Sequence, residues 1–318
     1  MEIRVIRGQK TNRMKRKTLN CNGKLVCIDQ PMVMGIVNVA PDSFYDGGNY
    51  LTETDLLKRC EAIIAEGGGM IDIGAVSTSP GAQNVDAVEE LRRLDWALAC
   101  VRKHFPAEII SVDTYRADVA KAAVEHYSVD MINDISAGTL DTRMFETVAT
   151  LNVPYVLTHI QGTPSTMQEN PVYGNLMEEL IAYFSSLVQR LRKLDVKDII
   201  IDPGFGFGKT IAHNYEILRH LKKLEIFDLP IMVGVSRKSM IYKLLETDAQ
   251  HALNGTTVVN TLALASGADI LRVHDVKEAV ECVKIITNYE LQITDIEHEG
   301  TLRNVLKINY HIHPASKV

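Results

Sequence analysis

The stretch from residue 33 to residue 74 carries the repeating pattern that decides the fold. It begins with VMGIVNV (33–39), continues with TETDLLKRCEAIIAE (52–66) and ends, after three glycines, with MIDIG (70–74). The first and last segments are nearly continuous apolar runs, which are typical of parallel strands covered on both faces. The middle segment has apolar residues at helical spacing, and Thr52 and Asp55 open it with the spacing of a capping box. The stretch therefore predicts a strand, a helix and a second parallel strand.

The same unit repeats along most of the chain. Further amphipathic helices are predicted, among them Leu176–Leu194 and a last one over Val276–Ile286. The predicted strands are Val33–Val39, Met70–Gly74, Ile109–Asp113, Asp130–Asp134, Pro154–His159, Ile199–Asp202, Ile231–Ser236 and Asp269–Val273. Eight strands that alternate with helices predict an α/β fold, a single-domain (β/α)8 TIM barrel. A doubly wound open sheet is the runner-up, but no Pro/Gly/Ser-rich linker divides the chain into two sheets.

Two segments lie outside this count of strands and helices. Residues 1–30 are expected to form a short strand or hairpin that closes the bottom of the barrel, and residues 31–288 to form the barrel itself. Residues 289–318 are a polar tail, whose His311 and His313 are expected to be solvated rather than to bind metal. The length of 318 residues agrees with one barrel of about 250 residues plus extensions.

Composition and charge narrow the classes of function. Apolar residues make up 46% of the chain and charged residues 23%, so a sizeable core is expected. The net charge of −6 argues against nucleic-acid binding, which requires cations that neutralise phosphates. No apolar stretch approaches the roughly 18 residues of a membrane span, and the basic N-terminus lacks the apolar part of a secretory signal. Five scattered cysteines without a C-x-x-C pair favour reduced thiols in the cytoplasm.

Nearly every predicted strand ends in polar residues. In a barrel, catalytic groups occupy these strand ends and the loops that follow them. The residues are Asn38, Asp72, Asp113, Asn133, Asp134, His159, Asp202, Ser236, Arg237, Lys238, Arg272 and His274. Any one of them can be a structural polar group, but so many at the same end of the strands indicate one site.

Four of these residues suit a flat heterocycle. A carboxylate accepts two parallel N–H bonds from a guanidine-like edge, and an amide matches a mixed donor and acceptor face. The four are Asp113, Asn133, Asp202 and Lys238. They predict a ligand with an amino-pyrimidinone edge.

Three others suit a phosphate group. Arg272 and His274 are two residues apart on one strand, so both side chains can face the same point. The amide oxygen of Asn38 can supply the single protein ligand of a Mg²⁺ that otherwise binds phosphate and water. The segment IDPGFGFGKT (201–210) resembles a P-loop, but Pro203 stands where the pattern requires glycine.

With these residues placed, the sequence closely resembles dihydropteroate synthase over roughly residues 31–287. The matching segments are MGIVNVAPDSFYDGG (34–48), IDIGAVSTSPGA (71–82), SVDTYRADVA (111–120), INDISAG (132–138), THIQGTP (158–164), IDPGFGFGKT (201–210), VGVSRKS (233–239), NGTTVVN (254–260) and ADILRVHD (268–275). The resemblance implies a (β/α)8 barrel that condenses 6-hydroxymethyl-7,8-dihydropterin pyrophosphate with p-aminobenzoate in folate biosynthesis. It also implies Mg²⁺, sulfonamide binding and a homodimer, with small-molecule substrates and neither nucleic acid nor membrane as a partner.

The resemblance also assigns roles to residues. Pterin-binding positions are matched by Asp113, Asn133, Asp202 and Lys238, the metal-binding asparagine by Asn38, and the pyrophosphate anchors by Arg272 and His274. Phe44 and Asp46 match positions in a first loop that closes over the reacting centre, and Thr78 matches a substrate-contacting threonine in a second loop. Residues around the aminobenzoate are matched by Pro80, Phe207, Lys238 and Ser239. Lys238, Arg272, His274, Phe44 and Asp46 are thus the catalytic candidates.

The chain departs from the family pattern at three positions. The second loop of the family usually has arginine where this chain has Ser79, and a hydroxyl does not replace a bidentate guanidinium. Ala40 stands for the usual threonine, and Thr158 for the methionine that is common beside the pterin. Ser79 keeps open the alternative of a pterin-binding homologue with weak or no synthase activity. A corrinoid-linked methyltetrahydrofolate methyltransferase is a second alternative, although such an enzyme has no pyrophosphate to anchor.

Overall fold

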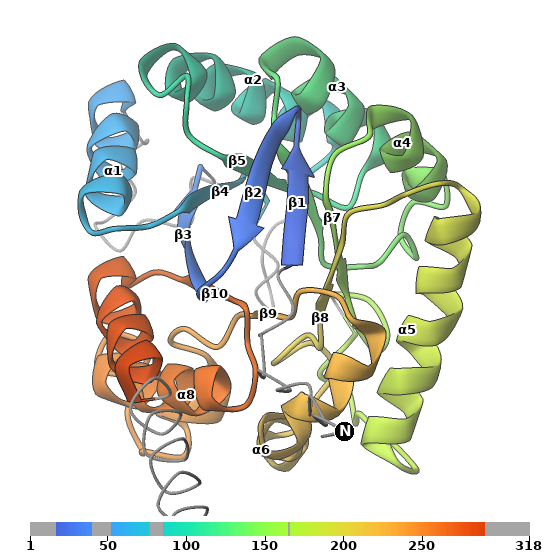
Figure 1. The fold of residues 1–318 in the computed structure, drawn as a ribbon, viewed down its shortest axis with the longest axis vertical. Helices are drawn as coiled ribbons and strands as arrows, with labels where there is room; N and C mark the ends of the chain where they lie inside the picture. The colour runs from blue at the N-terminus through green and yellow to red at the C-terminus, as the bar shows by residue number, and fades with distance from the viewer. Residues whose placement is uncertain (1–16, 40–51, 77–84, 165, 290–318) are drawn as a thin grey trace, which may run out of the picture.

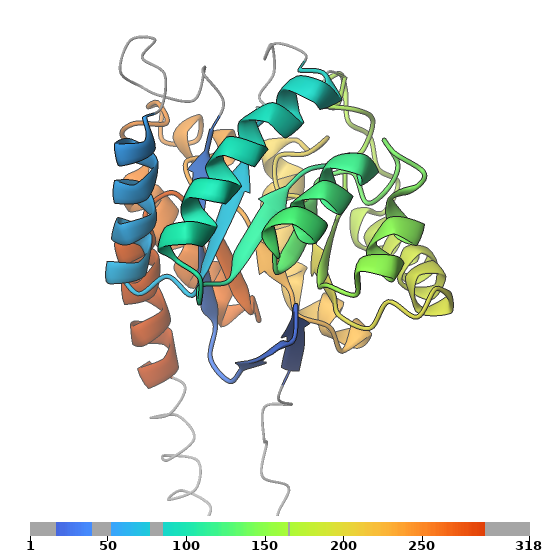
Figure 2. The same cartoon turned by 90° about the horizontal axis from the view of Figure 1, so that it is seen from above.

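The structure is a computed structural model that describes residues 17–39, 52–76, 85–164 and 166–289. In these residues the chain forms a two-stranded hairpin and an eight-stranded sheet wrapped by helices (Figures 1 and 2). The hairpin strands are β1 (Lys17–Cys21) and β2 (Lys24–Ile28). The sheet strands are β3 (Met32–Asn38), β4 (Met70–Gly74), β5 (Ile110–Asp113), β6 (Met131–Asp134), β7 (Tyr155–Thr158), β8 (Ile199–Asp202), β9 (Met232–Val233) and β10 (Ile270–Val273).

Helices connect successive strands on the outside of the sheet (Figure 1). They are α1 (Glu53–Ala65), α2 (Ala87–His104), α3 (Ala117–Tyr127), α4 (Met144–Leu151), α5 (Leu176–Lys193), α6 (Ile211–His220), the 3₁₀ helix η2 (Leu221–Phe227), α7 (Ser239–Tyr242), α8 (Leu253–Ala265) and a last helix over residues 276–289. The capping box expected from the sequence is present, because the Thr52 hydroxyl accepts the backbone N–H of Asp55 at 3.2 Å. None of the helices in the described ranges is long and apolar enough to cross a membrane.

The sheet closes on itself. Its strand order is β8-β7-β6-β5-β4-β3-β10-β9, and every neighbouring pair is parallel. A parallel bridge joins Ile201 of β8 to Ile231 just before β9, and the Ile201 N–H donates to the Pro230 carbonyl at 2.9 Å. The predicted (β/α)8 barrel is therefore confirmed, and the open doubly wound sheet is wrong.

One strand is much shorter than its sequence predicts. The apolar run Ile231–Ser236 was expected to be a strand, yet β9 covers only Met232–Val233. Beyond it the chain turns at Arg237, which has a φ of 53°. The Arg237 guanidinium pairs with Asp275 and donates to the carbonyls of Ala249 and Gln250, so it fixes a loop rather than the end of a strand.

The hairpin covers the end of the barrel where the strands begin (Figure 2). Its Leu19, Cys21 and Ile28 are buried in an apolar cluster inside the barrel. Seven barrel strands contribute one side chain each to that cluster: Met34, Met70, Met131, Val156, Ile200, Met232 and Ile270. The hairpin predicted within residues 1–30 is confirmed for residues 17–28, whereas the boundaries of the three chain segments stay a prediction.

We expect Leu19→Ala to destabilise the protein by about 2–5 kcal/mol, because it opens a cavity in the cluster that seals the barrel. Leu19 is 1% exposed. The matched control is Leu25→Ala in the same hairpin, where the leucine is 72% exposed and the cost is expected to stay within about 0.5 kcal/mol. Urea unfolding measures both, and equal stability of the two variants would contradict the sealing role of the hairpin.

Candidate active site

The charged residues of the barrel interior follow from the alternation of side chains along each strand. The apolar cluster at the lower end fixes which residues face inward, and the next inward residue lies two positions further along. These positions hold Ile36, Asp72, Ser111, Asn133, Thr158, Asp202, Gly234 and Arg272. The polar members other than Arg272 are buried. The inside of the barrel is thus apolar near the start of the strands and polar toward their ends.

Arg272 is the centre of the polar layer. Its Nε donates to Asp72 at 2.7 Å and its Nη2 donates to Asp113 at 2.6 Å. The amide nitrogen of Asn133 donates to the same oxygen of Asp72 at 3.0 Å. The other Asp72 oxygen is buried and has no hydrogen-bond partner among the described residues. The guanidinium therefore joins β10 to β4 and β5, and the bond from Asn133 to Asp72 adds β6 to the network.

Burial and the neighbouring charges oppose each other in this network. It raises the pKa of Asp113 to about 7, although Arg272 acts to lower it and Asp72 adds to the increase. The pKa of Arg272 is raised, chiefly because Asp72 and Asp113 favour its charged form against the cost of burial. The guanidinium therefore remains a cation, and Asp113 is a carboxyl group that can exchange a proton near neutral pH.

Asp202 and Lys238 carry opposite charges, and each shifts the pKa of the other. Asp202 ends β8, is buried and accepts the backbone N–H of Gly204 at 2.7 Å. The Lys238 ammonium donates to the Phe205 carbonyl at 2.6 Å and lies 4.7 Å from the centre of the Phe207 ring. Burial lowers the pKa of Lys238 to about 8, against the opposing effect of Asp202. Burial also raises the pKa of Asp202, while Lys238 lowers it.

A buried lysine holds the glycine-rich loop after β8. The Lys209 ammonium lies 2.9 Å from Nδ1 of His159 and donates to the carbonyls of Gly204 and Phe207 at 2.9 and 3.0 Å. Gly204 has a φ of 70°, and a Cβ there would overlap the carbonyl oxygen of His159. The loop therefore passes against His159 with no room for a side chain, and Phe207 is set beside Lys238.

The structure brings most of the predicted residues together but gives some of them unexpected partners. Arg272 and His274 were expected to face the same point as anchors of a phosphate group, and the Arg272 guanidinium bridges two carboxylates. His274 follows β10 with an exposed side chain, and its backbone N–H donates to Ser236. Ser239 begins α7 beside Lys238. Asn38 ends β3 half-buried, and its amide bonds to no side chain or backbone group in the described residues.

Other predicted residues cannot be placed in the same way. Phe44, Asp46, Thr78 and Pro80, together with Ser79, lie outside the described residues. Asp134 lies in the described residues and has a structural role. Its carboxylate accepts hydrogen bonds from Ser136, from the backbone N–H of Gly138 and from the Tyr155 hydroxyl. It is a structural residue that happens to end a strand.

Sequence reasoning placed Asp72 among the polar strand ends without a specific role or partner, and it assigned no role to Lys209. Counting in steps of two from Met70 would have placed Asp72 inside the barrel, opposite Arg272. Lys209 gave no comparable signal, because its partners are a histidine ring and backbone carbonyls that only the folded loop assembles.

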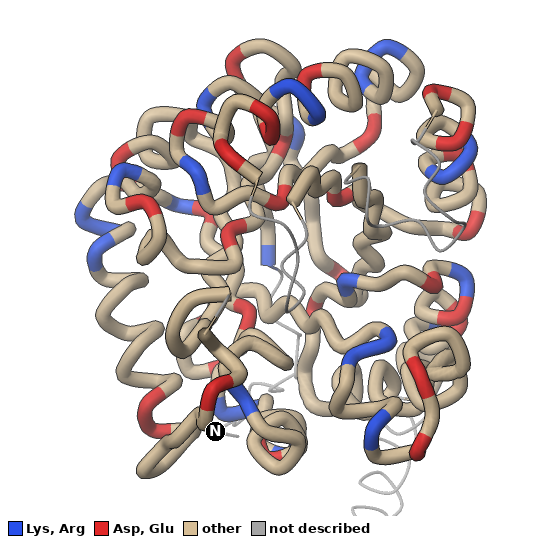
Figure 3. The backbone as a smooth tube through the Cα atoms, turned by 180° about the vertical axis from the view of Figure 1, so that it is seen from behind, with Lys and Arg blue, Asp and Glu red and all other residues tan. Residues whose placement is uncertain are grey.

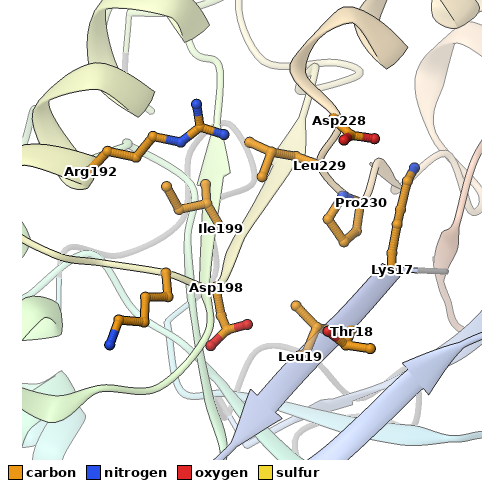
Figure 4. Close-up of a pocket in the computed structure, with 10 residues that line it drawn as sticks. Lys17, Thr18, Leu19, Arg192, Asp198, Ile199, Asp228, Leu229 and Pro230 are labelled. Atoms are coloured by element: carbon orange, nitrogen blue, oxygen red, sulfur yellow. The ribbon is translucent and has the colours of Figure 1, made fainter. Parts of the chain in front are cut away.

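A separate cavity lies at the opposite end of the barrel (Figure 4). It has a volume of about 440 Å³ and is lined by residues of β1, of the start of β8 and of the segment before β9. Figure 4 shows Arg192, Lys17 and Asp228 around it. It contains none of the residues of the polar layer, and the strand starts that frame it are the end of a barrel associated with stability rather than chemistry.

The fold and the polar layer define the class of protein: a TIM-barrel enzyme that binds small polar ligands at its strand ends. Acidic and basic positions are mixed over the outer helices (Figure 3). The charged residues inside the barrel therefore form a cluster that is separate from the charges on the outer helices.

Comparisons with known proteins identify the family. The family model described as "Pterin binding enzyme" matches residues 34–274. Dihydropteroate synthase of Escherichia coli is 38% identical over 270 residues, which are 84% of this chain and 95% of that protein. The Synechocystis enzyme of the same name is 40% identical over 256 residues, or 80% of this chain and 88% of that protein.

Solved structures agree with the sequence relatives. A Yersinia pestis dihydropteroate synthase in a sulfonamide drug complex has a TM-score of 0.81 and 38% identity, and the match covers 86% of this chain and 99% of that one. A Xanthomonas albilineans dihydropteroate synthase with 4-aminobenzoic acid has a TM-score of 0.80 and 34% identity, over 86% and 98% of the two chains. The chain therefore belongs to the pterin-binding enzymes and, within them, to the dihydropteroate synthases, which are transferases of folate biosynthesis.

We expect Arg272→Met to destabilise the protein more at pH 8 than at pH 5.5. Removing the cation leaves two buried carboxyl groups without their partner, which costs about 3–5 kcal/mol when both are charged. Arg272 lowers the pKa of Asp113, so its removal raises that pKa above the wild-type value of about 7. Below pH 7 both folded proteins take up the proton, whereas above pH 7 the variant alone keeps losing stability until its higher pKa is passed.

Urea unfolding at the two pH values measures this effect. Arg143→Met is the matched control, because Arg143 pairs with Asp118 on the surface with 61% of its own side chain exposed. That pair should contribute about 0–1 kcal/mol at either pH. A loss at Arg272 that is small or independent of pH would show that its pairing does not hold the carboxyl groups.

Proposed function

We propose that this chain condenses 6-hydroxymethyl-7,8-dihydropterin pyrophosphate with p-aminobenzoate, giving 7,8-dihydropteroate and pyrophosphate. The observation that carries this assignment is the placement of Asp113, Asn133 and Asp202 at the ends of β5, β6 and β8, on the inner side of one barrel. Lys238 stands beside them with its ammonium bound to the Phe205 carbonyl. Their acceptors and donors match the N–H groups and ring nitrogens of a pterin.

Arg272 and His274, at the same carboxyl ends of the strands, would bind the pyrophosphate. Arg272 uses Nε and Nη2 for its two carboxylates, which leaves the two N–H groups of Nη1 for an anionic ligand. The side chain is 20% exposed, so it is within reach of a ligand above the polar layer. His274, exposed two residues further on, can donate a second bond to the same pyrophosphate. The carboxylates thus orient Arg272 while they balance its charge.

Asn38 fits the metal predicted for this reaction. Its amide is at the end of β3 and half-buried, so its oxygen can act as a ligand at the same end of the barrel as Arg272 and His274. One neutral oxygen is a donor set suited to Mg²⁺ that keeps several waters and binds substrate phosphates. When bound there, Mg²⁺ would supply positive charge to the pyrophosphate as it leaves.

The residues of the chain would act mainly through charge and position. Arg272 and His274 stabilise the negative charge that grows on the departing pyrophosphate. The carboxylates of Asp113 and Asp202 favour the resonance-stabilised cation that remains on the pterin methylene group. Phe207 and Ser239 border the place from which the aniline nitrogen attacks. That nitrogen is nucleophilic when neutral, so no strong general base is required.

We also propose that the enzyme acts in the cytoplasm as a homodimer. The cysteines in the described residues are free thiols, which suits a reducing compartment. An apolar surface on α8 and on the turn after α7 supports a dimer. Val258 and Leu262 of α8 are 52% and 48% exposed, and Leu245 of the turn, 53% exposed, lies next to Gly255 of α8. Sedimentation velocity measures the assembly, and a monomer at micromolar concentration would contradict the proposal.

A steady-state assay tests the reaction. We expect pyrophosphate release that requires both substrates and Mg²⁺. Asp202→Asn should weaken pterin binding about tenfold or more, because an amide cannot accept two N–H bonds as a carboxylate does. Asp118→Asn, on the exposed outer face of α3, is the matched control and should leave binding unchanged.

Calorimetry separates the alternatives that the sequence left open. Tight binding of the pterin without turnover on addition of p-aminobenzoate would indicate a pterin-binding homologue, in line with Ser79. Unchanged pterin affinity in Asp202→Asn would contradict the placement of the pterin against β8.

Thr158→Val tests whether the Thr158 hydroxyl, on the strand between those of Asn133 and Asp202, contacts the pterin. The Thr158 hydroxyl is buried on the inner side of β7 and has no hydrogen-bond partner in the described part of the chain. Replacing it with a methyl group should leave the free energy of unfolding unchanged or increase it, because an unpartnered buried hydroxyl is costly. If the hydroxyl bonds the pterin, affinity for the pterin should fall several-fold in the same variant. Thr158→Ser, which keeps the hydroxyl, should retain affinity, and equal affinity of all three proteins would rule out the contact.

A further inference from the structure

Three side chains of metal-binding type meet on the outside of the barrel, away from the strand ends. They are Glu53, the first residue of α1, and Cys100 and His104 in the last turns of α2. One ligand atom from each lies within 4.8 Å of the other two. None of the three belongs to the polar layer, and the reaction proposed above uses none of them.

The helix geometry explains why these groups converge. Cys100 and His104 are four residues apart on α2, so their side chains lie on one face of that helix. Leu56, Cys60 and Ile63 on α1 and Leu94, Ala97 and Val101 on α2 belong to one buried core, and this packing brings the two helices together. Glu53 then reaches across from α1. The cluster therefore joins two helices whose nearest ligands, Glu53 and Cys100, are 47 residues apart in sequence.

The mixture of atoms favours zinc over the harder divalent cations. A thiol sulfur, an imidazole nitrogen and a carboxylate oxygen are all ligands of tetrahedral Zn²⁺, whereas Mg²⁺ and Ca²⁺ take oxygen. In such a site the ligand atoms stand about 3.5 Å apart, given bond lengths of about 2.0–2.3 Å. Cys100 is only 8% exposed and fixed in the core, while the exposed side chain of Glu53 can rotate to close the remaining distance.

A hydrogen bond already orients the histidine. Nδ1 of His104 lies 2.9 Å from the Cys100 carbonyl, so that nitrogen carries the proton and Nε2 keeps the lone pair. Histidines that bind zinc are commonly held in this way, with the second nitrogen donating to a backbone carbonyl. This bond is an observation independent of the clustering of the three ligand atoms.

We propose that Glu53, Cys100 and His104 form a zinc site in which a water completes the coordination and the ion cross-links α1 to α2. Zinc binding displaces the proton of the thiol. Binding must therefore release a proton and strengthen as the pH rises.

The test is titration of the full-length protein with Co²⁺ and Zn²⁺ in the presence of excess Mg²⁺. Co²⁺ reports the thiolate through a sulfur-to-cobalt charge-transfer band, which histidines elsewhere in the chain cannot produce. We expect one equivalent of Co²⁺ to give this band, Zn²⁺ to abolish it by displacement, and Zn²⁺ to raise the melting temperature. Cys100→Ser and His104→Ala should each weaken binding at least about tenfold.

Cys27→Ser is the matched control, because Cys27 is an exposed free cysteine on the hairpin. It should keep the band and the Zn²⁺-dependent rise in melting temperature. Melting of the metal-free variants shows whether they are folded, and Cys100→Ser is close to isosteric. Zn²⁺ affinity that is equal in the wild type and Cys100→Ser, or no charge-transfer band in the wild type, would overturn the proposal. Neither result depends on the synthase reaction.

Discussion

The ion pairs of Arg272 with Asp72 and Asp113 are the interaction on which the polar half of the barrel depends. Two carboxyl groups on neighbouring strands could not both be charged inside a barrel without a cation between them. Arg272 comes from β10, on the other side of β3 from β4, and joins that strand to β4 and β5. Asn133 extends the same network to β6. The charged residues at the proposed ligand site are therefore paired with one another in the protein without ligand.

This arrangement is possible because the lower half of the barrel is closed. The hairpin residue Leu19 and the apolar side chains around it exclude water from below and set the inward face of each strand. The next inward position on β4, β6, β8 and β10 is then Asp72, Asn133, Asp202 or Arg272. The inner layer holds both signs, with Arg272 and Lys238 set among Asp72, Asp113 and Asp202. In the proposed reaction the anionic substrate is met by the remaining N–H groups of Arg272 and not by a net positive charge.

The sequence was sufficient for the barrel and for most of the residues at its strand ends. Apolar runs such as Ile199–Asp202 coincide with strands because parallel strands are buried on both faces. It was insufficient where contacts are between distant segments. Nothing local to Asp72 or Arg272 shows that they pair across 200 residues, and Lys209 is held by carbonyls that only the folded loop presents. The shortening of β9 likewise depends on Arg237 reaching Asp275.

The most direct test of this account is a crystal structure of the chain with dihydropterin pyrophosphate, p-aminobenzoate and Mg²⁺. The account predicts the pterin edge within hydrogen-bond distance of Asp113, Asn133 and Asp202, and the pyrophosphate beside Arg272 and His274. A pterin bound anywhere else, such as in the cavity between the hairpin and the start of β8, would contradict it.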